Sequence, residues 1–332
     1  MSLDISTKAI KPVRLTYDQV ARRIGENKAG SRYQEATYDI QPTTNFHYRP
    51  LWDPRYEVFD TSRTAIVMQD WYAFHDPRQY YYGTYTMARA KQQEVAEKNF
   101  SFVEKRGLLD TAPHIVKQKV RDFFTPLRHV EWGANMNNCF ITDTGYGTAI
   151  TQVTMFNSID RLGIAQYLTR LCLLVDENET TGIDKAKEDW LSRDIWQELR
   201  HVVEDIFVIE DWFETMVAQN IVMDGLIYPL IYDRLAGEMM HEGGSAIVML
   251  TEFMNEWQQE TVRWTNALVK VTAQESDANK DLLSQWVAHW SDRITEALKP
   301  ISAEAFSGDG ELFVQEVKQD LLERLSKQGL KV

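Results

Sequence analysis

Residues 194–224 read DIWQELRHVVEDIFVIEDWFETMVAQNIVMD, a stretch that contains neither glycine nor proline. Its apolar side chains recur at steps of three or four residues: Ile206, Ile209, Phe213, Met216 and Val217. This spacing places them on one face of a helix with about 3.6 residues per turn. The stretch therefore predicts one long, uninterrupted helix, and we expect Gly225 and Pro229 to end or kink it.

Most of the remaining chain shows the same helical pattern. The further helices are predicted at 85–106, 113–141, 148–175, 245–273, 280–298 and 311–327. In the third of these the recurring apolar positions are Val153, Phe156, Ile159, Leu162 and Leu171. Pro126 is expected to kink the second, because proline removes a backbone donor and clashes with the preceding turn. No segment alternates like a strand, so the pattern predicts an all-α protein built as a bundle of long helices.

An aromatic arm precedes these helices. Residues 33–85 are rich in Tyr, Trp, Phe and Arg, follow no helical or strand period, and are interrupted by four prolines: Pro42, Pro50, Pro54 and Pro77. Tyr, Trp and Arg are the residues that most often anchor protein interfaces. The composition favours an arm that lies on a partner protein, and the alternative is an arm folded back on the chain's own core.

Composition and charge exclude several classes of protein. The chain has 332 residues and a net charge of −13 with no Lys/Arg block to offset it, so we expect no nucleic-acid-binding surface. The two cysteines, Cys139 and Cys172, form neither a disulfide framework nor a metal motif, which indicates a reducing cytoplasm. We expect no secretory signal and no membrane-spanning helix, because the apolar segments that these need are missing.

Two Glu-x-x-His motifs, Glu198–His201 and Glu238–His241, raise the possibility of a di-iron site. The i, i+3 spacing puts both ligands of a motif on one helical face, and such a site also needs a Glu from each of two further helices. About 20 residues of unbroken helix after Glu198 would span about 30 Å, so we expect the two motifs to lie apart on the surface. The alternative is a self-contained di-iron oxygenase that uses Glu198, His201, Glu238 and His241.

Three asparagines cluster inside the predicted helix at 113–141. Asn135, Asn137 and Asn138 occupy mid-helix positions, where asparagine is poorly favoured. They predict either a buried polar network or a substrate-binding site. The network is favoured, because buried amides normally satisfy one another's hydrogen bonds.

Long stretches of the sequence resemble the β subunit of the hydroxylase component of bacterial multicomponent phenol hydroxylases. They include TNFHYRPLWDP at 44–54, DWYAFHDPRQYYYGTY at 70–85, PLRHVEWGANMNN at 126–138 and DWFETMVAQNIVMDGLIYPLIY at 211–232. The resemblance runs over nearly the whole chain and is therefore specific. The β subunits of toluene monooxygenases share only a sparser pattern of the same residues.

The resemblance implies a ferritin-like helical fold, related to that of a catalytic α subunit but without its irons. It implies partners too: a di-iron α subunit and a small γ subunit, in a dimer of αβγ units. In such systems α hydroxylates phenols to catechols with O₂, a reductase with flavin and an iron–sulfur cluster passes electrons from NADH, and a regulatory protein docks on the hydroxylase. By this resemblance no catalytic, metal-binding or cofactor-binding residue is expected in this chain.

One position agrees with that division of labour. The helix after the turn at 142–147 should carry Glu-x-x-His in an α-type subunit, but here it reads Asp160-Arg161-Leu162-Gly163, with glycine in place of histidine. We therefore expect Asp160 to form a salt bridge or hydrogen bond in the core.

The predicted organisation is an N-terminal arm over residues 1–84 and a ferritin-like helical domain over 85–332 that lacks metal ligands. We expect the arm between residues 33 and 60 to wrap the α subunit, because aromatic side chains bury much area at low entropy cost. The predicted interface anchors are Tyr48, Arg49, Trp52, Arg55 and Tyr56. A third interpretation is a helical adaptor with no role in oxygenation.

Overall fold

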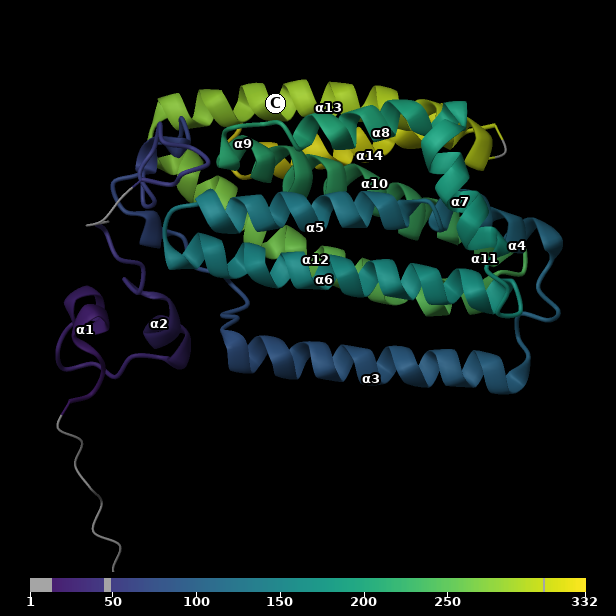
Figure 1. Cartoon of the computed structure of the whole chain (residues 1–332), viewed down its shortest axis with the longest axis horizontal. Coiled ribbons are helices and arrows are strands. Elements are labelled where there is room, and N and C mark those ends of the chain that lie inside the picture. The colour runs from purple at the N-terminus through teal and green to yellow at the C-terminus, as the bar shows by residue number, and fades with distance from the viewer. Residues whose placement is uncertain (1–13, 45–48, 307) are drawn as a thin grey trace, which may run out of the picture.

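The computed structural model describes residues 14–44, 49–306 and 308–332, and within these ranges it is helical without strands. The helices form an elongated bundle, and α1 (Asp18–Ile24) and α2 (Arg32–Thr37) lie off one end of it (Figure 1). The first part of the bundle consists of α3 (Tyr82–Arg106), α4 (His114–Lys119), α5 (Leu127–Thr144), α6 (Thr148–Val175), α7 (Thr181–Ser192) and α8 (Asp194–Ile206). The second part consists of α9 (Trp212–Met216), α10 (Asp224–Tyr228), α11 (Ala236–His241), α12 (Ser245–Glu275), α13 (Asp277–Ala305) and α14 (Gly310–Ser326). The predicted all-α bundle is confirmed.

Four helical elements surround the centre of the bundle. The helices α5 and α6 form an antiparallel pair, and Figure 1 shows them side by side in front of α12. The helices α9, α10 and α11 are parts of one continuous helix that packs against α5 and α12. Helices α8, α13 and α14 cover one edge of this core, and α3 runs along the opposite edge against α12 (Figure 1). In the described ranges no helix combines the length and the apolar character needed to cross a bilayer.

Wider turns accommodate the prolines inside two of these helices. Residues 120–124 form a π-helical turn before Pro126, in which the amide of Thr125 donates to the carbonyl of Val120 at 2.9 Å. A second π-helical turn, at 229–235, begins at Pro229. The chain stays helical from α9 through α11, so neither Gly225 nor Pro229 ends this helix.

The uninterrupted helix predicted over 194–224 is wrong. The first helix, α8, ends at Ile206, residues 207–211 form a turn, and a new helix begins with α9 at Trp212. Asp211 caps this new helix, since its carboxylate accepts a hydrogen bond from the amide of Phe213 at 2.8 Å. The same carboxylate accepts from the amide of Ala65 at 2.7 Å, so the arm helps to hold the break.

The arm divides into a buried part and an exposed part. Among the aromatic residues before α3 that the structure describes, those that are buried are Tyr33, Tyr38, Trp71, Tyr72 and Phe74. The Trp71 ring lies 5.3 Å from the ring of Trp212 on α9. Asn279 on α13 pairs with both backbone groups of Val67, at 3.1 and 2.8 Å. These stretches are folded back on the chain's own bundle, as the alternative interpretation of the arm states, whereas Leu51 and Trp52 are 90% and 77% exposed.

Candidate functional site

A buried guanidinium occupies the centre of the four-helix core. Arg161 on α6 is fully buried, and its Nη1 donates to Glu131 Oε2 on α5 at 3.1 Å. Its Nη2 donates to the carboxylate of Asp224 on α10. The Tyr228 hydroxyl accepts from Nη1 at 3.3 Å and donates to Glu131 at 2.7 Å. The Trp257 ring on α12 lies 4.3 Å from the guanidinium carbon, so all four core elements meet at this one side chain.

At this centre two acidic side chains share a single cationic partner. Burial raises the pKa of Glu131 and of Asp224, and the Arg161 guanidinium opposes that rise. Burial lowers the pKa of Arg161, but the two carboxylates raise it by more, so the guanidinium stays charged. Two carboxyl groups therefore depend on one cation, and loss of that cation would leave buried charge without a partner.

Two of the three clustered asparagines, Asn137 and Asn138, form the predicted network, whereas Asn135 donates to the backbone and side chain of Ser158 at 2.8 Å. Asn138 on α5 and Asn220 exchange amide hydrogen bonds, at 3.1 Å and 2.9 Å. Asn137 donates to Gln219 at 2.9 Å, and Gln219 in turn donates to Asp224 at 3.2 Å. The amides thus extend the polar centre along the bundle, and the network interpretation is confirmed for these residues.

Asp160, next to Arg161 on α6, belongs to a second polar cluster. Its carboxylate accepts hydrogen bonds from Tyr85 at 2.8 Å, from Arg89 at 2.8 and 2.7 Å, and from the Trp257 indole at 2.9 Å. Arg89 also pairs with Glu260 on α12 at 2.9 Å. The expected salt bridge is confirmed, and it ties α3 to α6 and α12.

A di-iron cluster does not fit the residues of this centre. Four-helix folds that hold two irons use four glutamates and two histidines that project inward. Here the Arg161 guanidinium lies between the carboxylates of Glu131 and Asp224 and pairs with both, so in this arrangement neither carboxylate is free to bind a metal cation. In the described part of the chain no three His, Cys, Asp or Glu side chains come together in a way that could hold a metal ion.

The two Glu-x-x-His motifs lie away from this centre. On α8 the side chains of Glu198 and His201 are 68% and 59% exposed. On α11 Glu238 lies 3.5 Å from the ammonium group of Lys119, and His241 is exposed. Their predicted surface positions are confirmed, although the unbroken helix from which that prediction was argued is wrong.

His129 on α5 is half-buried, and its Nε2 atom is buried without a hydrogen-bond partner. Its ring stacks on Trp190 at 5.6 Å, and burial, with a smaller contribution from Arg128, lowers its pKa to about 4. Below about pH 6.5 His129 is protonated in the unfolded chain but stays neutral in the folded chain, so the free energy of unfolding falls as the pH drops towards 4.

We expect the wild-type chain to lose about 1 kcal/mol of stability through His129 between pH 7 and pH 5, after allowance for the partial exposure of the ring. The substitution His129→Gln should remove that share of the loss. Urea unfolding at both pH values measures it. An unchanged difference between the two pH values in His129→Gln would contradict the assignment.

The predicted arm anchors are only partly free for a partner. Tyr48 lies outside the described residues. Trp52 and Arg49 are exposed, and the Arg49 side chain donates to the carbonyl of Pro54 at 3.1 Å. Arg55 pairs with Glu210 at 3.1 Å, beyond the end of α8. Tyr56 is half-buried and lies 5.4 Å from the Arg55 guanidinium. The structure thus leaves Trp52 exposed and engages Arg49, Arg55 and Tyr56 in contacts within this chain.

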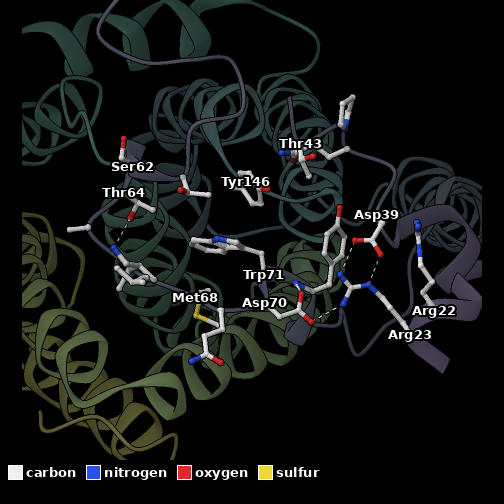
Figure 2. A pocket seen from close by; sticks show the side chains of 18 residues that line it. Arg22, Arg23, Asp39, Thr43, Ser62, Thr64, Met68, Asp70, Trp71 and Tyr146 are labelled. Carbon is white, nitrogen blue, oxygen red and sulfur yellow. Dashed lines mark hydrogen bonds and ion pairs between the residues drawn. The ribbon is translucent and has the colours of Figure 1, made fainter. Parts of the chain in front are cut away.

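A pocket of about 900 Å³ lies where the arm meets the end of the bundle. Figure 2 shows Arg23 reaching towards Asp39 and Asp70, with which it forms ion pairs at 2.6 and 2.7 Å. Its guanidinium also lies 4.7 Å from the Tyr72 ring. The Arg23 guanidinium therefore links the part of the arm around Asp39 to the part around Asp70.

An exposed apolar face on α5 and α6 was not predicted from the sequence. It consists of Trp132, Met136, Met155, Ile159 and Leu162, each between 43% and 53% exposed, and we call it the α5–α6 apolar face. Of the exposed positions that continue these rows, Cys139 and Gln166 are uncharged, and Asp143, one residue before the end of α5, carries a charge. The two helices pack against each other along their length, and no other helix is drawn in front of them in Figure 1. Large, contiguous apolar patches on a protein surface are typical of interaction sites.

Comparisons with known proteins agree with this architecture. The model of the family described as Methane/Phenol/Alkene Hydroxylase matches residues 52–276. The chain is 47% identical over 331 residues to the oxygenase component DmpL of phenol 2-monooxygenase from Pseudomonas sp. (strain CF600), covering 100% of this chain and 99% of that protein. It is 40% identical over 330 residues to the component MhpL from Acinetobacter pittii (strain PHEA-2), covering 99% and 98%.

A solved structure extends the similarity to three dimensions. A chain of xenon-pressurized phenol hydroxylase from Pseudomonas sp. OX1 superposes with a TM-score of 0.94 and 45% identity, and 99% of each chain is covered. The predicted ferritin-like fold is confirmed by this match. The chain therefore belongs to the methane, phenol and alkene hydroxylase family, and the relatives that it matches over their full length are oxygenase components of phenol monooxygenases.

Proposed function

We propose that this chain is the non-catalytic β subunit of the oxygenase (hydroxylase) component of an NADH-dependent multicomponent phenol hydroxylase. A di-iron α subunit converts phenols to catechols with O₂, and this chain is the scaffold on which α is held. The assembly is a cytoplasmic dimer of αβγ units, served by a flavin and iron–sulfur reductase and by a regulatory protein. The full-length similarity to oxygenase components of phenol 2-monooxygenases supports this reaction class.

The position of Arg161 carries the non-catalytic role. In a di-iron subunit the centre of the four-helix core holds the metals and their inward-facing ligands. In this chain the same region is filled by a guanidinium bonded to both Glu131 and Asp224. A chain built in this way supports a sister subunit's chemistry without supplying the oxygen-activating group.

The α5–α6 apolar face supports the scaffold role. Interface cores are enriched in Trp and Met and depleted in charge, as this face is. Its side chains recur at i, i+4 on α5 and at i, i+4, i+7 on α6, which suits a partner helix laid along the pair. We propose that the α subunit covers this face, and that the exposed stretch of the arm at 49–58 adds a second contact.

The arm contact has its own test. Replacing Trp52 and Tyr56 together by Ala is expected to weaken binding to the α subunit by at least about 30-fold, because the loss of a single central aromatic anchor already costs about 2 kcal/mol or more. Co-elution of the two subunits at decreasing concentration measures the change. Tyr17→Ala, at an exposed aromatic residue before α1, is the control and should not alter it. Unchanged assembly of the double variant would remove the arm from the interface.

Reconstitution tests the proposed function as a whole. This chain is expressed alone and together with the other hydroxylase subunits of its source, and each preparation is supplied with reductase, regulatory protein, NADH and phenol. Catechol should form only with the complete set, and the omission of this chain should abolish it. Catechol formation by this chain alone after iron loading would establish the self-contained oxygenase instead. Purification of the native complex without any iron-bearing subunit would establish the adaptor.

A further inference from the structure

The surroundings of Arg161 resemble the coordination shell of a hard metal ion. Oxygen atoms of five side chains accept hydrogen bonds from its three guanidinium nitrogens: Glu131, Asn157, Asn220, Asp224 and Tyr228. Two of these are carboxylates, two are amide carbonyls and one is a phenol hydroxyl. Oxygen ligands of these kinds suit Mg²⁺, Ca²⁺ and Mn²⁺ rather than softer ions.

The oxygens reach the centre from separate helical segments. Glu131 comes from α5, Asn157 from α6, Asn220 from the π-helical turn between α9 and α10, and Asp224 from α10. Asn157 lies one helical turn before Arg161 on α6, and its side-chain oxygen accepts a hydrogen bond from Arg161 Nε at 3.3 Å. The arrangement therefore depends on the bundle as a whole and is built around one positive charge.

We propose that the bundle centre is a cation site whose built-in occupant is the Arg161 guanidinium, and that removal of this side chain opens a site for a hard divalent ion such as Mn²⁺. The positive charge joins carboxylates of α5 and α10 as a bridging metal would, so the chain keeps a metal-like centre without depending on a metal. This inference rests on the proposed non-catalytic role, but it concerns the ligand shell of this chain alone.

The experiment uses the full chain in its complex with the other hydroxylase subunits. The variant Arg161→Ala removes the guanidinium and leaves the five oxygens in place. After dialysis against MnCl₂ and then buffer, it should retain one more equivalent of Mn²⁺ per copy of this chain than the wild-type complex. Its unfolding temperature should rise by several degrees with Mn²⁺, since a ligand that binds only the folded state stabilises it.

The triple variant R161A/E131Q/D224N is the matched control. It lacks the guanidinium as well, but its two carboxylates have become amides, so it should gain neither the extra Mn²⁺ nor the thermal shift. A folded R161A complex with native helical content and no additional Mn²⁺ would overturn the inference. That result would leave the proposed scaffold role untouched, because the wild-type complex and its assembly are not altered in it.

A second comparison decides the matter if R161A does not fold. Arg161→Lys keeps a positive charge, whereas Arg161→Met keeps a similar volume without charge. If the centre needs a cation, R161K should give several-fold more soluble complex than R161M. An equal or greater yield of R161M would show that the centre needs volume rather than charge, and it would overturn the inference.

Discussion

Lysines placed at Met136 and Ile159 together are expected to weaken assembly with the α subunit by about 1000-fold and to leave this chain folded. Both side chains belong to the α5–α6 apolar face, one on each helix. Each would place a charge in the desolvated centre of an interface, where a single anchor is worth about 2 kcal/mol or more. Two such losses sum to about 4 kcal/mol, which corresponds to about a thousandfold change in the dissociation constant.

The same substitutions should change the stability of the free chain by less than about 0.5 kcal/mol, because both positions are already exposed. Leu312→Lys on α14, at a leucine that is 56% exposed, is the matched control and should assemble normally. Light scattering or analytical ultracentrifugation of the mixed subunits measures assembly, and urea unfolding measures stability. Normal assembly of M136K/I159K would show that the partner lies elsewhere on this chain.

Trp71→Ala is expected to cost the free chain about 3–5 kcal/mol, because it deletes a large buried ring and leaves a cavity. The ring packs between Trp212 at 5.3 Å and Tyr146 at 6.1 Å, so it joins the arm to α9 and to the turn before α6. Its loss should release the neighbouring part of the arm and expose it to proteases.

Trp52→Ala provides the comparison within the same arm. Trp52 is 77% exposed, so its replacement should leave the free energy of unfolding within about 0.5 kcal/mol of wild type. Urea denaturation and limited proteolysis of the two variants separate the arm into its intramolecular part and its partner-facing part. Equal stability of the two variants would contradict this division.

The long helices could be predicted because local signals mark their ends. The predicted bounds 148–175 are those of α6, where Gly147 with φ +88 precedes the first turn and a polar loop follows the last. The break at 207–211 was missed because apolar residues continue at helical spacing across it. A local signal for it exists, since Asp211 followed by Glu214 has the pattern of a helix start.

The bundle centre could not be predicted from local patterns. Glu131, Arg161 and Asp224 come from three helices, and only the register of these helices against one another brings their side chains together. The sequence shows that Gly163 stands where an α-type subunit has histidine. It does not show that the Arg161 guanidinium occupies the centre of the bundle. Periodicity alone says nothing about which helices meet.

The α5–α6 apolar face was missed for a related reason. Ile159 and Leu162 belong to the same helical series in the sequence as Val153 and Phe156, yet the first pair is exposed and the second is buried. The helix α6 is apolar on two sides, and a sequence pattern does not say which side faces the chain's own core. A helix of this kind in a chain expected to have partners is itself a signal of an interface.

Iron anomalous scattering from crystals of the assembled hydroxylase locates each metal chain by chain, and it therefore shows whether this chain holds iron. We expect iron peaks in the partner α subunit and, inside this chain, electron density for the Arg161 side chain between Glu131 and Asp224. Two iron peaks within the four-helix core of this chain would show that it is a di-iron subunit itself.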